Sequence, residues 1–261
     1  MFMPSVLIAD DLSCFFILIM EISVCVLVGL LALAGSFIQR VCGFGFGIFI
    51  MTMLPYLMPS YQEATALSGL LSLLQSSVVL CTMWRHLRIR NMVGVFLTFC
   101  VFSFFAIRFV SVAGDGVLKV FLGCVLILLG LYFLLFSSRV RVTPTPKWQI
   151  SLGALSGTMG GIFGMHGPAA VVYFLNSETT KEGYLAVCQA YFVVTNIYMS
   201  VFRAGSGFMT VAVGAGVLVS LVGIGLGVWI GSRVFDRIPQ DTLKRIIYFY
   251  MILAGVVAIV F

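Results

Sequence analysis

Charged residues are scarce in this sequence of 261 residues. Asp, Glu, Lys and Arg together make up 9% of it, whereas a soluble globular protein carries about 25%. So few charged side chains cannot cover the water-facing surface of a chain of this length. Hydrophobic residues account for 61%, and the mean hydropathy is +1.16. We therefore expect an integral membrane protein whose exterior is covered largely by lipid.

Groups that carry enzymatic or metal chemistry are also few. The chain has nine Asp and Glu residues and two His residues. It contains no HExxH, GxSxG or Walker lysine motif, and no GxGxxG leading into a soluble βαβ unit. Its seven cysteines lie almost wholly in apolar segments without the CxxC or Cys/His spacing of a metal site, so they are expected to be buried small side chains. We expect a protein that is not an enzyme and that needs neither a metal nor a cofactor.

Basic residues exceed acidic residues, and the net charge is +6. They form short clusters between apolar runs, where they would face the cytoplasm and anionic lipid headgroups, so no nucleic-acid partner is required. Asp10 and Asp11 stand where a secretory signal peptide would have basic residues, which argues against a cleavable signal. The lipid bilayer is thus the first expected partner.

Apolar runs follow one another closely along the chain. A full membrane crossing needs about 20 apolar residues at about 1.5 Å each, and most of the runs meet this requirement. The second, sixth and seventh runs do not, and glycine bounds or interrupts them. We expect these three to be half-helices or re-entrant hairpins buried in an all-α membrane protein. The runs span approximately residues 13–38, 44–58, 64–84, 92–110, 117–136, 149–163, 167–176, 184–202, 208–232 and 242–261.

A basic linker with two prolines, SSRVRVTPTPK at residues 137–147, divides the chain into halves of similar length. We expect a first transmembrane repeat over residues 1–136 and a second over residues 148–261. Each half contains a glycine-rich stretch, and Arg85 after the third run has a counterpart in Arg203 after the eighth. The repeated order of these features predicts a duplicated unit. Arg85 and Arg203 are expected to act as topology and gate residues at opposite membrane faces.

Loop charges set the expected orientation. The cluster of Arg85, Arg88 and Arg90 is separated by two crossings from the basic linker, so both lie on one side, which the positive-inside rule makes the cytoplasm. The loop at 233–245, with four Lys or Arg residues, falls on the same side. The N-terminus and the C-terminus then lie outside, and the two halves have opposite orientations. Inverted repeats, each with a short Gly-rich helical hairpin, are typical of secondary transporters.

Two glycine motifs are the sharpest local signals. Residues 43–47, GFGFG, open the short second run, and residues 160–168, GGIFGMHGP, open the short seventh run. Glycine adopts positive φ angles, and proline suits the first turn of a helix. The free N–H groups at such a helix start carry about +0.5 of a charge and attract anions. Glycine is also common wherever transmembrane helices pack, but two motifs at matching positions favour an anion site.

At these motifs the sequence resembles the TauE/SafE family of sulfite and organosulfur-anion exporters. The resemblance rests on the pattern Gln-x-x-x-Gly-Phe-Gly-Phe-Gly at 39–47 and on GGIFGMHGPAAVVY at 160–173. It also rests on the duplication, the basic central linker and the total length, so it covers nearly the whole chain. The resemblance implies two hairpins that meet at the substrate site, export of sulfite, sulfoacetate or taurine-derived anions, and a place in the bacterial inner membrane.

Polar side chains near the motifs are the candidates for contact with a small anionic substrate. An unpaired charge at the depth of Arg40 is costly, so Arg40 is expected to face a cavity, to pair with Glu21 or to extend to the interface. His166, with a reference pKa of about 6.5, would hydrogen-bond an oxyanion, relay a proton or pack as a neutral side chain. Amide donors inside apolar helices are offered by Gln75, Gln189 and Asn196. The candidate substrate-binding set is Gln39, Arg40, Gly43, Gly45, Gly47, Gln75, Gly161, Gly164, His166, Gly167, Pro168 and Asn196.

These features favour an alternating-access carrier of a small sulfur oxyanion or sulfonate. A channel or passive facilitator built on the same hairpins stays open, as does a carrier of small carboxylates. An intramembrane enzyme is less favoured, because it needs a reactive group at the motifs and Cys42 is the only candidate there. The sequence leaves open the exact substrate, the direction of transport, the coupling ion and the oligomeric state, a homo-oligomer included.

Overall fold

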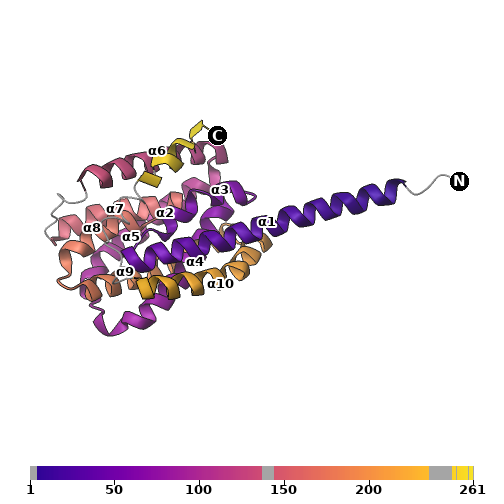
Figure 1. Ribbon diagram of the computed structural model, residues 1–261. Coiled ribbons are helices and arrows are strands. Elements are labelled where there is room, and N and C mark those ends of the chain that lie inside the picture. Colours follow the sequence, from indigo (N-terminus) through magenta and orange to yellow (C-terminus); the bar gives the residue numbers. More distant parts are fainter. Residues whose placement is uncertain (1–4, 137–143, 235–248, 251, 258, 261) are drawn as a thin grey trace.

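The computed structural model describes residues 5–136, 144–234, 249–250, 252–257 and 259–260 (Figure 1). Helices make up the regular structure of these residues, as the composition predicts. The elements are α1 (Ser5–Cys42), α2 (Phe46–Met51), α3 (Leu54–Leu57), α4 (Tyr61–Met83), η1 (Trp84–His86), α5 (Arg90–Val112), α6 (Asp115–Phe136), α7 (Pro146–Phe163), α8 (Gly167–Ser177), α9 (Lys181–Gly205) and α10 (Val211–Val234).

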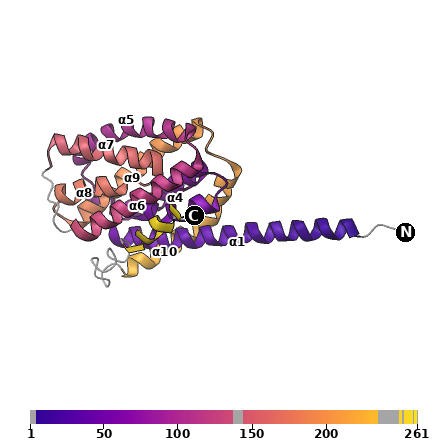
Figure 2. The same cartoon turned by 90° about the horizontal axis from the view of Figure 1, so that it is seen from above.

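Six of the described helices are long and apolar enough to cross a membrane. This confirms the prediction of an all-α, multi-pass membrane protein. The N-terminal part of α1 projects beyond the helical body in both views (Figures 1 and 2). The six segments are Ser23–Cys42, Tyr61–His86, Met92–Val112, Asp115–Leu135, Lys181–Gly205 and Val211–Val234.

The three short apolar runs do not appear among those six segments. The run at 44–58 is split into α2 and α3, of six and four residues, and the run at 167–176 forms α8, of 11 residues. Helix α7 has 18 residues and is longer than the half-helix expected at 149–163. It begins inside the expected linker because Pro146 in its first turn favours a helix start there. The tenth run, 242–261, lies mostly outside the described residues.

Helices α4 and α9 form the centre of the molecule. Their membrane segments are 50% and 61% buried, against 33% for those of α5, α6 and α10. The two helices run antiparallel, since Ser72 of α4 bonds Asn196 of α9 while Gly69 lies beside Arg203. Their shared interior carries the buried polar side chains of Thr65, Ser68, Ser72, Gln75, Ser76, Gln189, Thr195, Asn196 and Arg203. The core of this lipid-exposed protein is therefore polar along its middle.

Two close helix pairs flank this centre, α1 with α10 and α7 with α5 (Figure 2). A Cβ atom at Gly153 would lie 2.7 Å from the Val95 carbonyl oxygen, and one at Gly157 would lie 2.6 Å from that of Phe99. A Cβ atom at Gly223 or at Gly227 of α10 would lie even closer to the backbone of α1, 2.3 Å from a carbonyl oxygen in each case. Glycines four residues apart let the backbones approach, which supplies packing where lipid offers no hydrophobic driving force.

Candidate functional site

The first hairpin turns between α1 and α2. Helix α1 ends at Cys42, and Gly43 and Gly45 then have φ angles of 83° and 111°, which are left-handed and favour glycine. The side-chain oxygen of Gln39 accepts a hydrogen bond of 3.2 Å from the N–H of Phe46, the first residue of α2. Gln39 thereby satisfies one of the donors that a helix start leaves open. The glycine motif at 43–47 therefore forms a tight turn between two helices, at the expected place in the sequence.

The second hairpin turns between α7 and α8. Helix α7 ends at Phe163, Gly164 has a φ of 66°, and α8 begins at Gly167. Pro168 lies in the first turn of α8, where its missing N–H is not needed. The hydroxyl of Ser156 donates a hydrogen bond of 2.6 Å to the carbonyl oxygen of His166, which holds the turn against its own first helix.

The tips of the two hairpins touch each other. A Cβ atom on Gly47 would lie 2.8 Å from the carbonyl oxygen of Gly164 and 3.4 Å from the Cα of Met165. A Cβ atom on Gly167 of the second tip would lie 3.7 Å from the Cβ of Phe44 in the first. Segments more than 100 residues apart in the sequence thus meet backbone to backbone, and only glycine fits at position 47 without moving a tip.

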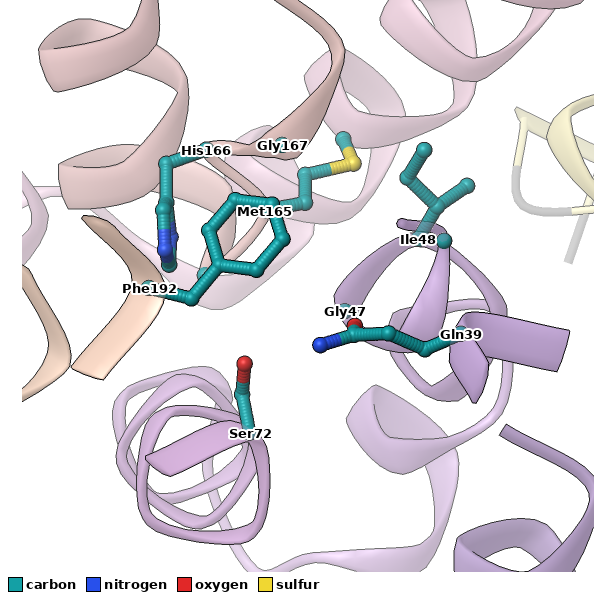
Figure 3. Close-up of a pocket in the computed structure, with 10 residues that line it drawn as sticks. Gln39, Gly47, Ile48, Ser72, Met165, His166, Gly167 and Phe192 are labelled. Carbon is teal, nitrogen blue, oxygen red and sulfur yellow. The ribbon is translucent and has the colours of Figure 1, made fainter. Parts of the chain in front are cut away.

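A small cavity lies where the tips meet (Figure 3). Its free volume is about 10 Å³, which is about the room of one water molecule. The imidazole of His166 lies beside the ring of Phe192, and the hydroxyl of Ser72 and the amide of Gln39 extend toward the space between the helices (Figure 3). The cavity is lined by Gln39, Gly45, Gly47, Ile48, Ser72, Gly164, Met165, His166, Gly167 and Phe192.

His166 is the most unusual lining residue. Its side chain is 3% exposed, and neither ring nitrogen has a hydrogen-bond partner among the described residues. Its ring is held by aromatic neighbours, with centroids 5.2 Å from Phe192 and 5.6 Å from Phe99. Buried polar groups are normally hydrogen-bonded, and an unpaired one costs about 1–3 kcal/mol. A ligand with hydrogen-bonding atoms is what would satisfy this imidazole.

An amide network fixes the first tip against the central helices. The amide nitrogen of Gln39 donates to the side-chain oxygens of Gln75, Ser76 and Gln189, the last two at 3.0 and 3.1 Å. Gln189 in turn donates to the carbonyl oxygen of Gly43 at 3.1 Å. The Gln39 amide is therefore occupied by protein groups on both sides, and its first role is to position the turn.

The predicted site residues are brought together in part. Lining the cavity are Gln39, Gly45, Gly47, Gly164, His166 and Gly167. Gly43, Gln75 and Asn196 lie one hydrogen bond from a lining residue or its hairpin. Three predicted residues lie away from the cavity. Gly161 packs against α5, and Pro168 faces an apolar hollow between α6 and α7. Arg40 points to α10, where its Nε donates a hydrogen bond of 2.8 Å to Ser232. The side chain of Glu21, the suggested partner of Arg40, lies outside the described residues.

Two residues near the site were missed by the sequence analysis. Ser72 lines the cavity, but a serine in an apolar helix carries no distinctive signal. Arg203 was expected to act as a topology and gate residue at a membrane face, and its complete burial was not foreseen. Its position in the last turn of α9 suggested a surface residue, yet the side chain folds inward to the carbonyl oxygen of Gly160.

The chemistry of the cavity is that of hydrogen-bond donors without a formal charge. No Asp, Glu, Lys or Arg is among its lining residues. Asn196 donates to the Ser72 oxygen at 3.1 Å, which leaves the hydroxyl proton of Ser72 for another acceptor. The first turn of α8 adds N–H groups that have no acceptor within the helix. Together with His166, these groups suit a small anion.

Comparisons with known proteins identify the family of the chain. A family model described as sulfite exporter TauE/SafE matches residues 27–258. A protein of Cupriavidus necator (strain H16), described as a probable sulfite/organosulfonate exporter TauE, is 24% identical over 243 residues, which cover 88% of this chain and 92% of that relative. No solved structure matches the chain. The matched family consists of transporters and not enzymes, so the enzyme hypothesis built on Cys42 is set aside. The chain belongs to the sulfite exporter TauE/SafE family of membrane transporters.

Proposed function

We propose that this protein is a secondary transporter that exports small sulfur-containing anions, such as sulfite, sulfoacetate or related sulfonates, across the bacterial inner membrane. The observation that carries the proposal is the cavity between the two hairpin tips, in which the buried imidazole of His166 has no protein partner among the described residues. The family model and the relative from Cupriavidus necator support the substrate class.

The donor set favours an anion over a cation or a sugar. A cation would need carboxylate or carbonyl oxygens turned inward, and no carboxylate lines the cavity. An oxyanion can accept hydrogen bonds from the N–H groups at the start of α8, from Ser72 and from the N–H of a neutral His166. A volume of about 10 Å³ is too small for such a ligand, so the tips must part before one enters.

We infer an alternating-access mechanism in which two inverted repeats, residues 1–136 and 148–261, move against each other around the tips. The packing of helices supports it, since the first helix of each proposed repeat lies along the third long helix of the other, α1 on α10 and α7 on α5. Rocking two such bundles would open the cavity to one side at a time. The basic segment 85–90, with exposed Arg88 and Arg90, would face the cytoplasm and both termini the outside.

Export follows from the membrane potential. A potential that is negative inside drives a monovalent anion outward with about 2.3 kcal/mol per 100 mV. Uptake against this potential would require coupling to a proton or a cation. The protein can therefore act as an exporter with no further energy source.

The test is a ligand panel on the full chain purified in detergent, with binding read as a shift in melting temperature. Sulfite, thiosulfate and sulfoacetate are compared with taurine, sulfate and acetate, and ³⁵S-sulfite counterflow in proteoliposomes then measures transport. We expect a sulfur anion to stabilise the protein and to show saturable counterflow. Stabilisation by acetate alone would point to a carboxylate carrier, and flux without counterflow to a channel. If no anion raises the melting temperature, the proposal is wrong.

A matched pair of glycine variants links binding to the hairpin tip. Gly164 at the tip and Gly207 in the turn after α9 both have positive φ, 66° and 79°. Gly164→Ala and Gly207→Ala therefore impose similar backbone strain, but only the first strains the cavity. We expect the sulfite-induced shift to be lost in Gly164→Ala and kept in Gly207→Ala. Equal loss in both variants would separate the site from the tips.

A further inference from the structure

A buried arginine lies one residue away from the uncharged cavity. The side chain of Arg203 is completely buried, and its Nη2 donates a hydrogen bond of 2.9 Å to the carbonyl oxygen of Gly160. The same Gly160 borders His166, since a Cβ atom there would lie 2.8 Å from the Cβ of His166. One glycine thus separates a buried positive charge from the cavity wall.

The charge of Arg203 has no counter-charge among the described residues. Its Nε and Nη1 have no hydrogen-bond partner there, and no carboxylate of the described chain forms an ion pair with it. Burying an unpaired cation is costly, and arginines inside membrane proteins usually pair or face a pathway. The contact with Gly160, near the C-terminal end of α7, offsets only part of that cost. Arg203 therefore holds a positive charge in the protein interior that no carboxylate of the described residues pairs with.

Polar groups connect this arginine with the cavity. Gly69 of α4 leaves room for the guanidinium, because a Cβ atom there would lie 2.8 Å from Nη1 of Arg203 and 3.5 Å from Oδ1 of Asn196. Asn196 donates to Ser72, which lines the cavity. On α9, residues 192, 196, 199 and 203 follow the spacing of a single helix face. Arginine side chains on a helix lean toward its N-terminus, which here brings the guanidinium back toward the cavity.

We propose that Arg203 supplies the fixed counter-charge for the anion in the hairpin cavity and determines that the site selects anions over neutral solutes. This rests on the proposed function and specifies its electrostatics. The neutral donors of the tips orient the oxyanion, and the guanidinium behind Gly160 compensates its charge through a low-dielectric interior. Arg203 is thus a positioning and specificity residue that acts through the cavity wall.

The test measures sulfite affinity of detergent-purified Arg203→Gln, Arg203→Lys and the control Arg108→Gln by titrating the melting-temperature shift. Arg108 is an exposed arginine packed on Phe104, so its replacement removes a positive charge away from the cavity. We expect sulfite to bind Arg203→Gln at least tenfold more weakly, and Arg203→Lys and Arg108→Gln within threefold of the unmodified protein. Tenfold corresponds to about 1.4 kcal/mol.

The anion-free melting temperature separates a charge role from a structural one. If the guanidinium only caps α7, Arg203→Gln should have a lower anion-free melting temperature and an unchanged sulfite affinity. This result would overturn the inference. Equal weakening in Arg203→Lys and Arg203→Gln would also overturn it, because lysine keeps the charge. If Arg203→Gln does not fold, Arg203→Lys alone provides the test. A sulfite affinity within threefold of the unmodified protein supports the inference, and weaker binding overturns it. Absence of any sulfite response in the unmodified protein would instead refute the proposed function itself.

Discussion

Replacing Gly47 by alanine tests whether the two hairpin tips touch as the structure places them. The added methyl would lie 2.8 Å from the carbonyl oxygen of Gly164, whereas ordinary contact begins at 3.4 Å. The obstacle is backbone of the other tip and cannot rotate away, so the tips must separate by about 0.6 Å. Such a separation enlarges and distorts a cavity that now has room for about one water molecule.

The expected energy is the difference of two opposing terms. Overpacking a tight contact costs about 1–3 kcal/mol. Alanine in place of glycine in a helix returns about 0.5–1 kcal/mol, because glycine loses more backbone freedom on folding. Gly47→Ala should therefore destabilise the protein by about 1–2 kcal/mol. A shift of the binding groups by this amount should lower sulfite counterflow about tenfold, since each factor of ten is about 1.4 kcal/mol.

The matched control is Gly225→Ala in α10. Gly225 also lies in a transmembrane helix, but a Cβ atom there has no heavy atom within 4 Å. Its alanine variant should keep the melting temperature or raise it, and it should transport at the unmodified rate. Melting in detergent and ³⁵S-sulfite counterflow in proteoliposomes, normalised to folded protein, measure both variants. If Gly47→Ala behaves like Gly225→Ala in both assays, the contact between the tips is not as described here.

Three further variants probe packing, binding and the amide network. Gly227→Ala, two residues from Gly225 on α10, should lower the melting temperature because its methyl would press on the backbone of α1. Equal melting temperatures of Gly227→Ala and Gly225→Ala would contradict this packing. His166→Phe keeps a ring in the aromatic pocket but removes its nitrogens, so it should leave the anion-free melting temperature within a few degrees. It should weaken sulfite binding at least tenfold, because a hydrogen bond to a charged group contributes about 1.5–3 kcal/mol and about 1.4 kcal/mol corresponds to tenfold. Unchanged sulfite affinity would remove His166 from the site. Gln39→Leu should lower stability by about 1–3 kcal/mol, because it leaves the N–H of Phe46 and the side-chain oxygen of Gln189 without a partner, and unchanged melting would show that this network carries no stability.

Local physics made the hairpins predictable from the sequence. Gly43, Gly45 and Gly164, three of the motif glycines, have the positive φ angles that only glycine adopts without strain. Apolar runs of about 10–15 residues are too short to cross a bilayer. The runs at 44–58 and 167–176 form the short helices α2, α3 and α8. Both signals depend on a few consecutive residues, so a single sequence carries them.

The direction of each side chain was not predictable in the same way. Gln39 and Arg40 are neighbours in the sequence, but consecutive residues on a helix point about 100° apart. Gln39 therefore faces the cavity while Arg40 faces Ser232 of α10. Which of the two faces inward depends on where α10 packs, about 190 residues later. Gly161 packs against α5 within α7, whereas Gly164 lies beyond the end of that helix, where its φ of 66° turns the chain toward the cavity.

The burial of Arg203 shows why such tertiary information matters for function. An ion pair made directly with an arginine in the cavity would hold an anion firmly and would release it slowly, whereas transport requires binding that is easily reversed. The structure instead lines the cavity with neutral donors and keeps the positive charge behind Gly160. In the proposed arrangement the charge attracts an anion without forming a contact that must be broken on release. From its position in the sequence, Arg203 was predicted to lie at a membrane face. The antiparallel packing of α4 and α9 places its guanidinium beside Gly69 and near the cavity wall.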